Sequence, residues 1–170
     1  MKATEVTSLY EMCQKNSMTI WIDGGWAVDA LLGHQSRPHK DVDIVIQEQD
    51  VSRLRELLQG KGYREIKLEI ARPHNFVFGD EQGHEIDIHV IVLDANGNGM
   101  YGPIDNGEMY PEDSLTGTGF IAGQAVRCIS PEWLVKFHSG YKLQEKDFRD
   151  VSALCEKFGL LLPEEYVKFQ

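Results

Sequence analysis

Three aspartates in two apolar segments are the residues best suited to chemistry in this chain. Asp41 and Asp43 lie one residue apart in the stretch 41–47, and Asp87 lies in the stretch 84–92. Alternate strand residues share a face, with Cα atoms about 6.5–7 Å apart. Carboxylates in that arrangement suit Mg²⁺, and two such ions about 3.5–4 Å apart assist nucleotidyl transfer. If the two strands are neighbours, the acids form a metal site; the alternative is an exposed strand face with no role.

A glycine pair precedes these acids in the sequence. The apolar stretch 19–23 ends in Gly24 and Gly25, and a helical pattern follows at 26–32 and ends at Gly33. A strand that turns directly into a helix presents unpaired backbone amides, and such amides bind phosphate. The glycines and the aspartates together predict nucleotide chemistry.

The elements that must position these residues follow from hydrophobic periodicity. The pattern predicts an α+β domain in which a mixed, mostly antiparallel sheet packs on helices. We expect a core at 1–128 and a helical part at 129–170 that walls the substrate cleft. Residues 94–119, rich in Gly, Asn, Asp and Pro, read as a long surface segment, with disorder as the alternative. The remaining expected elements are a helix at 4–15, a helix capped by Asp50, strands at 63–70, 75–78 and 84–92, a hairpin at 120–129, a helix from Pro131 and a helix through 151–158.

Composition narrows the function classes. The formal net charge is −10 at pH 7, which argues against a polymeric nucleic acid partner because such proteins usually carry a basic stripe. No apolar run reaches the length of a membrane span or a signal peptide core, so we expect a soluble cytoplasmic protein with no membrane partner. The three cysteines are isolated and lack metal-ligand spacing, which predicts three reduced, buried thiols.

Four short motifs resemble one enzyme family. They are residues 21–29 (WIDGGWAVD), 37–43 (RPHKDVD), 87–89 (DIH) and 137–141 (FHSGY). Together they look like the small antibiotic nucleotidyltransferases of the DNA polymerase β superfold. The greater likeness is to the lincosamide nucleotidyltransferases, and the aminoglycoside 2''-adenylyltransferases are similar at more distance.

The resemblance implies Mg²⁺-dependent transfer of AMP from ATP to a drug hydroxyl, with release of pyrophosphate and inactivation of the drug. By position, Asp41 and Asp43 would bind two Mg²⁺ ions. Asp87 would be a third ligand, the base that accepts the hydroxyl proton, or both. Glu85, two residues earlier on the same strand face, competes for the role of base and otherwise reads as a solvated residue.

The remaining predicted site residues bind the nucleotide or the acceptor. Backbone groups of the glycine pair would contact the triphosphate, and cations of the loop before Asp41 can reach phosphate oxygens. One turn of helix would place His138 and Tyr141 on adjacent faces beside the substrate. Trp21 and Trp26 read as core residues rather than base-stacking ones. The predicted nucleotide-binding residues are Gly24, Gly25, Arg37, His39, Lys40 and Lys146, and the predicted substrate-binding residues are Glu85, His89, His138 and Tyr141.

Several functions stay open at this point. An aminoglycoside 2''-adenylyltransferase is the first alternative to a lincosamide enzyme. A nucleotidyltransferase that modifies a protein or a tRNA end is disfavoured by the short acidic chain. A non-catalytic nucleotide-binding module would need a broken acidic triad, and all three acids are present. The acceptor hydroxyl, the preferred nucleoside triphosphate and the choice between monomer and homodimer are not encoded in these motifs.

Overall fold

A computed structural model of the chain describes residues 1–67, 73–102 and 108–167. Within these residues nine strands form one mixed sheet, with the main order β3-β4-β5-β2-β1-β9-β8 and with β6 and β7 extending from β5. Two of the described strand pairs, β1–β9 and β2–β5, are parallel, and the others are antiparallel. The predicted α+β class and mostly antiparallel sheet are therefore confirmed. The strands are β1 Ile20–Asp23, β2 Asp41–Gln47, β3 Arg64–Ile66, β4 Asn75–Gly79, β5 Glu85–Leu93, β6 Gly99–Tyr101, β7 Met109–Tyr110, β8 Gly117–Ile121 and β9 Gln124–Cys128.

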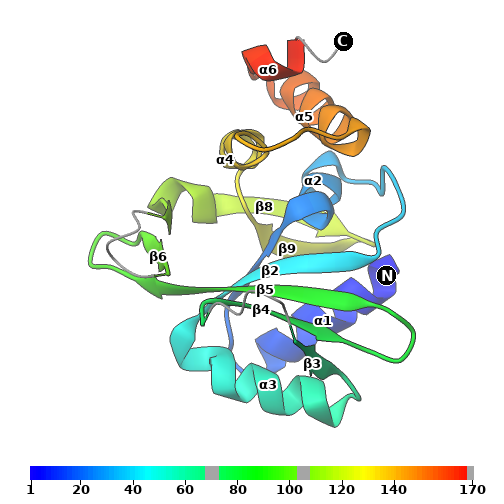
Figure 1. Cartoon of the computed structure of the whole chain (residues 1–170), viewed down its shortest axis with the longest axis vertical. Coiled ribbons are helices and arrows are strands. Elements are labelled where there is room, and N and C mark those ends of the chain that lie inside the picture. The colour runs from blue at the N-terminus through cyan, green and yellow to red at the C-terminus, as the bar shows by residue number, and fades with distance from the viewer. Residues whose placement is uncertain (68–72, 103–107, 168–170) are drawn as a thin grey trace.

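Helices cover both faces of the sheet. Helices α1 and α3 lie on one side, whereas α2, α4 and α5 lie on the other, with α6 at the far end (Figure 1). None of the described helices is long and apolar enough to cross a bilayer. The helices are α1 Ala3–Lys15, α2 Gly24–Leu32, α3 Val51–Gly60, α4 Pro131–Phe137, α5 Glu145–Phe158 and α6 Glu164–Val167, and short 3₁₀ helices span Glu48–Asp50 and Glu112–Thr116.

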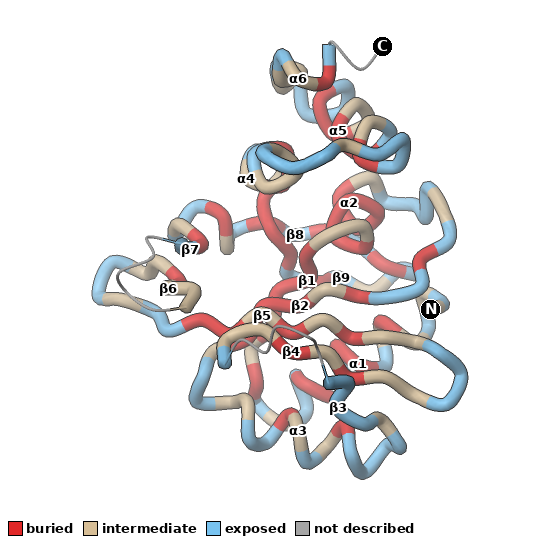
Figure 2. Tube along the Cα trace, in the orientation of Figure 1, coloured by how far each residue is buried: buried red, intermediate tan, exposed pale blue. Residues whose placement is uncertain are grey.

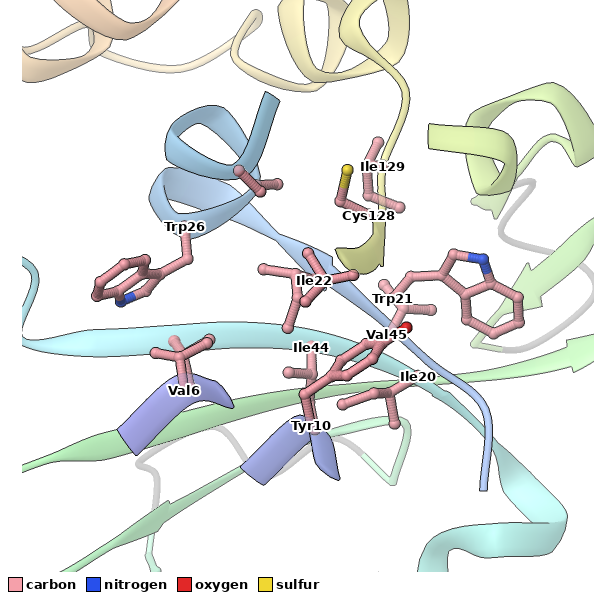
Figure 3. Packing of buried hydrophobic residues seen from close by; sticks show 14 of the residues in the cluster. Val6, Tyr10, Ile20, Trp21, Ile22, Trp26, Ile44, Val45, Cys128 and Ile129 are labelled. Carbon is pink, nitrogen blue, oxygen red and sulfur yellow. The ribbon is translucent and has the colours of Figure 1, made fainter. Parts of the chain in front are cut away.

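The core fills the space between the sheet and both helical layers. The central strands and α2 are the most deeply buried segments (Figure 2). Val6 and Tyr10 of α1 pack on one face of β1 and β2, and Trp26 of α2 packs on the other (Figure 3). The two tryptophans of the glycine motif are buried, at 6% and 2% exposure, as their core assignment predicted. All three cysteines are free and buried, and burial raises the pKa of Cys13 and Cys128 to about 12.

Several expected element boundaries were wrong. Helix α2 begins at Gly24, two residues early. Asp50 is the N-cap of α3 as expected, although its side chain makes no capping hydrogen bond. The expected strand at 63–70 is paired only over 64–66, and residues 68–70 lie outside the described part of the chain. The segment 94–119 holds short strands and a 3₁₀ turn with buried side chains rather than a surface loop alone. Its glycines and polar residues hid these short pairings.

Candidate active site

The site begins where β1 turns into α2. All four residues of β1 are buried, and Asp23 at its end accepts a hydrogen bond from the Gly24 amide at 2.8 Å, as a helix N-cap does. Gly24 has φ +56°, which only glycine adopts readily. A Cβ at Gly24 would lie 2.1 Å from Oδ2 of Asp43. The glycine turn therefore packs directly against a carboxylate of the neighbouring strand.

Strand pairing brings the acids into one row. In parallel β2 and β5, Asp43 lies opposite Asp87 and Asp41 lies opposite Glu85. In antiparallel β1 and β2, Asp23 lies opposite Asp43. The residues that alternate with these acids, such as Val42 and Ile86, are buried, so register and burial together direct the acids to the same face of the sheet.

Crowding of carboxylates changes the chemistry of Asp43. Burial, and then the charges of Asp23, Asp41 and Asp87, raise the pKa of Asp43 to about 8, against the lowering effect of Lys146. An acid held in this environment favours either a proton or a bound cation. The predicted nucleotide-binding Lys146, in the first turn of α5, lies close enough to act on this cluster electrostatically.

Ligand atoms of Asp43, Asp87 and His89 lie within 4.8 Å of one another. Asp41, the other predicted metal ligand, is exposed at the start of β2 and outside this group. Glu85 is bound by Lys40, whose Nζ lies 2.9 Å from its Oε1. These two predicted site residues therefore form an ion pair at the edge of the acidic row.

Two residues that sequence reasoning missed connect the acids to the cavity. The Tyr110 hydroxyl donates to Oδ2 of Asp23 at 3.0 Å and lies 3.1 Å from Nδ1 of His89. The Tyr110 hydroxyl donates its one proton to Asp23. Its oxygen can therefore only accept a hydrogen bond from Nδ1 of His89. In a neutral imidazole, Nε2 of His89 then carries a lone pair, 3.7 Å from Oδ1 of Asp87. Asp23 could have been found as the acid before the glycine pair, whereas nothing in the sequence marks Tyr110.

The loop before β2 folds back against the glycine turn. A Cβ at Gly25 would lie 2.5 Å from Nη2 of Arg37 and 2.7 Å from Nδ1 of His39. Each of these predicted phosphate ligands is also held by a buried acid. Asp150 binds the Arg37 guanidinium at 2.8 Å, and Asp29 binds Nε2 of His39 at 2.5 Å.

A cavity of about 900 Å³ opens above the acids. Asp23, Gly24, Asp43 and His89 belong to its lining. Aromatic rings form much of the remaining wall: the Tyr110 and Phe137 rings meet edge to face at 5.3 Å, and Trp133 contacts Phe137. The aromatic lining residues are Tyr101, Tyr110, Trp133, Phe137 and Tyr141.

The two predicted substrate residues near the C-terminus line this cavity, although not as expected. His138 and Tyr141 both belong to the lining. The expectation that one turn of helix joins them was wrong, because α4 ends at Phe137 and His138 is its C-cap. The imidazole Nδ1 of His138 lies 2.8 Å from the Leu134 carbonyl oxygen. Glu85 and Asp87 are both absent from the described lining of this cavity, whereas Asp43 and His89 belong to it.

Comparison with known proteins decides the family. A family model described as aminoglycoside-2''-adenylyltransferase matches residues 5–154. The chain belongs to this family. Like its relatives, it is a nucleotidyltransferase. The chain is 32% identical over 152 residues to a lincosamide resistance protein of Staphylococcus haemolyticus, which covers 88% of this chain and 92% of that relative. It is 27% identical over 140 residues to a 2''-aminoglycoside nucleotidyltransferase of Klebsiella pneumoniae, covering 79% of this chain and 73% of that one.

Solved structures agree with this family assignment. The lincosamide antibiotic adenylyltransferase LnuA, determined with lincomycin bound, matches with a TM-score of 0.77 and 30% identity over 89% of this chain and 94% of that one. ANT(2'')-Ia, determined with adenylyl-2''-tobramycin, matches with a TM-score of 0.74 and 21% identity over 92% and 89% of the two chains, which is evidence for the fold alone. The expected resemblance to antibiotic nucleotidyltransferases is confirmed.

Proposed function

We propose that this nucleotidyltransferase moves AMP from ATP to a hydroxyl of a lincosamide, releases pyrophosphate and so inactivates the drug. One observation carries the proposal. The Asp43 carboxylate faces Asp87 across neighbouring strands and touches the Gly24 turn, at the floor of an aromatic cavity. Residues 129–170, which supply α4, α5 and α6, would wall the acceptor side of that cavity.

The acidic row fits magnesium by its donor chemistry. Asp43 and Asp87 offer carboxylate oxygens a short distance apart. The raised pKa of Asp43 reflects its burial first and then the negative charge of the neighbouring acids, which a cation would neutralise. Asp43, Asp87 and Asp41 at the strand entrance would hold two Mg²⁺ ions between them. When bound, Mg²⁺ withdraws charge from phosphate oxygens and makes a coordinated hydroxyl more acidic.

Asp87 is suited to be the base. Its Oδ1 accepts a hydrogen bond from Nδ2 of Asn75 at 2.7 Å, which fixes the carboxylate plane. We propose that Asp87 takes the proton of the acceptor hydroxyl while that oxygen bonds to the α-phosphorus and the bond to pyrophosphate breaks. Glu85, the competing base, is instead paired with Lys40, whose Nζ lies 2.9 Å from its Oε1. Gly24 and Gly25 would offer backbone amides to the triphosphate, as the start of a helix does.

The character of the cavity supports a lincosamide acceptor. The described lining of the cavity holds three carboxylates, of which Asp23 and Asp43 belong to the acidic row and Glu108 lies elsewhere. Lys136 adds a positive charge beside Trp133. A wall of aromatic rings suits an acceptor with apolar groups. The protein named for lincosamide resistance and the lincomycin-bound LnuA also share more identity with this chain than the aminoglycoside enzymes do.

An aminoglycoside is the second candidate acceptor. The family model carries an aminoglycoside description, and the net charge of −10 would attract a polycation. A polyamine sugar needs several carboxylates at its amino groups, however, and the described cavity wall offers few.

Product analysis tests the proposal. The protein is incubated with Mg²⁺, ATP and either lincomycin, clindamycin or a panel of aminoglycosides, and the products are identified by mass spectrometry. We expect an AMP adduct on the lincosamides and none with the Asp43→Asn variant. AMP adducts on aminoglycosides alone would show that the acceptor is an aminoglycoside rather than a lincosamide. Normal turnover by Asp43→Asn would refute the mechanism.

A further inference from the structure

An ion pair with a buried carboxylate joins the loop before β2 to helix α5. Nη2 of Arg37 lies 2.8 Å from Oδ2 of Asp150, and Nε of Arg37 lies 3.2 Å and 3.3 Å from the two carboxylate oxygens. The Asp150 side chain is 3% exposed, and that of Arg37 is 26% exposed. An aspartate is rarely so deeply buried unless it is paired, and a fork of two nitrogens on one carboxylate fixes the orientation of the guanidinium.

The pair holds the guanidinium at the start of α2. A Cβ on Gly25 would lie 2.5 Å from Nη2, so this nitrogen packs against the glycine turn. Asp29 and Asp41 also act electrostatically on Arg37, and both favour its charged form. A cation that only covered the surface would need neither the buried carboxylate nor this contact. The Arg37 guanidinium is therefore oriented toward the place where helix amides are available to an anion.

The same pair also fixes one face of α5. Lys146 precedes Asp150 by four residues, so the two are neighbours along one side of α5, with Asp150 buried and Lys146 exposed. Lys146 acts electrostatically on Asp43. Between them Asp147 accepts a hydrogen bond from the Gln144 amide at 2.8 Å. Asp147 also lies close enough to Tyr141, which lines the cavity, to act on its hydroxyl electrostatically. A shift of α5 would thus move a cation and a cavity residue together.

We propose that Asp150 is a positioning residue for nucleotide binding: it holds the Arg37 guanidinium against Gly25 and sets the register of α5 that brings Lys146 to the acidic row. This role rests on the proposed nucleotidyl transfer. Neither Asp150 nor the link between Arg37 and α5 is marked by any sequence motif. The ion pair links the glycine turn, where the phosphates of ATP would bind, to helix α5.

A binding experiment with three variants tests this role. Asp150→Asn keeps the size of the side chain and removes its charge, Arg37→Gln removes the guanidinium, and the third variant combines both. The affinity for Mg²⁺-ATP and for adenosine is measured by titration calorimetry on each folded variant, followed by KM for ATP and for lincomycin. We expect Asp150→Asn to weaken Mg²⁺-ATP binding and raise KM for ATP about tenfold, as loss of a supporting partner does, with adenosine affinity unchanged.

Lys157→Gln is the matched control. Its Nζ donates to the Leu32 carbonyl oxygen at 2.8 Å, which is a second tie between α5 and α2 that does not face Gly25. This variant should keep the wild-type KM for ATP. The double variant should bind Mg²⁺-ATP no more weakly than the weaker-binding single variant, because both substitutions remove the same ion pair.

The outcomes separate this role from the proposed function. Wild-type Mg²⁺-ATP affinity in Asp150→Asn, effects that multiply in the double variant, or an equal rise of KM for ATP in Lys157→Gln would each overturn the positioning role. The proposed function would survive those results, because wild-type transfer to lincomycin is measured alongside. If the wild type binds Mg²⁺-ATP but forms no product, the positioning role is still tested by binding alone.

Discussion

Replacing Gly24 with alanine should damage the site more than it damages the fold. Gly24 is the first residue of α2, its φ is +56°, and an added Cβ would lie 2.1 Å from Oδ2 and 2.9 Å from Cγ of Asp43. These distances are too short for any contact, so Gly24→Ala must displace either the turn or the Asp43 carboxylate. The chain provides a matched control in Gly33, the C-cap of the same helix, whose φ is +80° and whose added Cβ would meet nothing within 4 Å.

The expected magnitudes follow from these two environments. A left-handed backbone costs an alanine about 1–2 kcal/mol, and this is the whole expected cost of Gly33→Ala. Gly24→Ala should add about 1–3 kcal/mol for the overlap with Asp43. The sum stays below a typical domain stability of roughly 5–15 kcal/mol, so we expect both variants to fold. Misplacing a reacting group by about 1 Å can cost on the order of hundredfold in rate.

Urea denaturation and Mg²⁺-dependent transfer to lincomycin are the assays. We expect Gly24→Ala to be less stable than Gly33→Ala and to lose about hundredfold in kcat/KM, while Gly33→Ala keeps nearly wild-type activity. Equal stability of the two variants together with near wild-type activity of Gly24→Ala would refute the close contact between the turn and Asp43.

Two further predictions concern the acidic row. Tyr110→Phe should lower the free energy of unfolding by about 1–3 kcal/mol, since it leaves the buried Asp23 carboxylate without its hydroxyl donor; an unchanged urea midpoint would contradict this. The pKa of Asp43 is raised from 3.8 to about 8, so the folded protein retains a proton that the unfolded chain releases, and metal-free stability should fall as pH rises from about 4 to 8. Mg²⁺ should therefore raise Tm more at pH 9 than at pH 6, and Asp43→Asn should remove that difference; an equal Mg²⁺ effect at both pH values would be evidence against it.

Local patterns in the sequence were sufficient to predict the strands that carry the acids. The strand at 41–47 has the predicted bounds, and in β5 buried Ile86, Ile88 and Val90 alternate with Glu85, Asp87 and His89 as expected. Alternation determines which face an acid occupies, because a shift of one residue would bury it. The prediction that Asp43 and Asp87 share a face therefore needed only their strands to be neighbours, and β2 and β5 do pair in parallel.

Long-range partners could not be predicted in the same way. Tyr110 reaches Asp23 across 87 residues, and Arg37 reaches Asp150 across 113. Such contacts depend on strand order and on how the helices cross the sheet, and no spacing rule along the chain encodes either. The error at His138 and Tyr141 has a local cause instead. Helical periodicity continues past Phe137, but α4 ends there and the chain turns at Gly140, whose φ is +85°.

The two hydrogen bonds that Asp23 accepts explain why an acid precedes the glycine pair. A carboxylate opposite Asp43 adds repulsion to a crowded row, which would be destabilising if it served only as a helix cap, because a serine would cap without charge. Asp23 instead accepts from the Gly24 amide and from Tyr110, so it fixes both the turn and the aromatic wall. Its charge also adds to the field that a bound cation would relieve. One residue thus connects the glycine turn, the cavity wall and the acidic row.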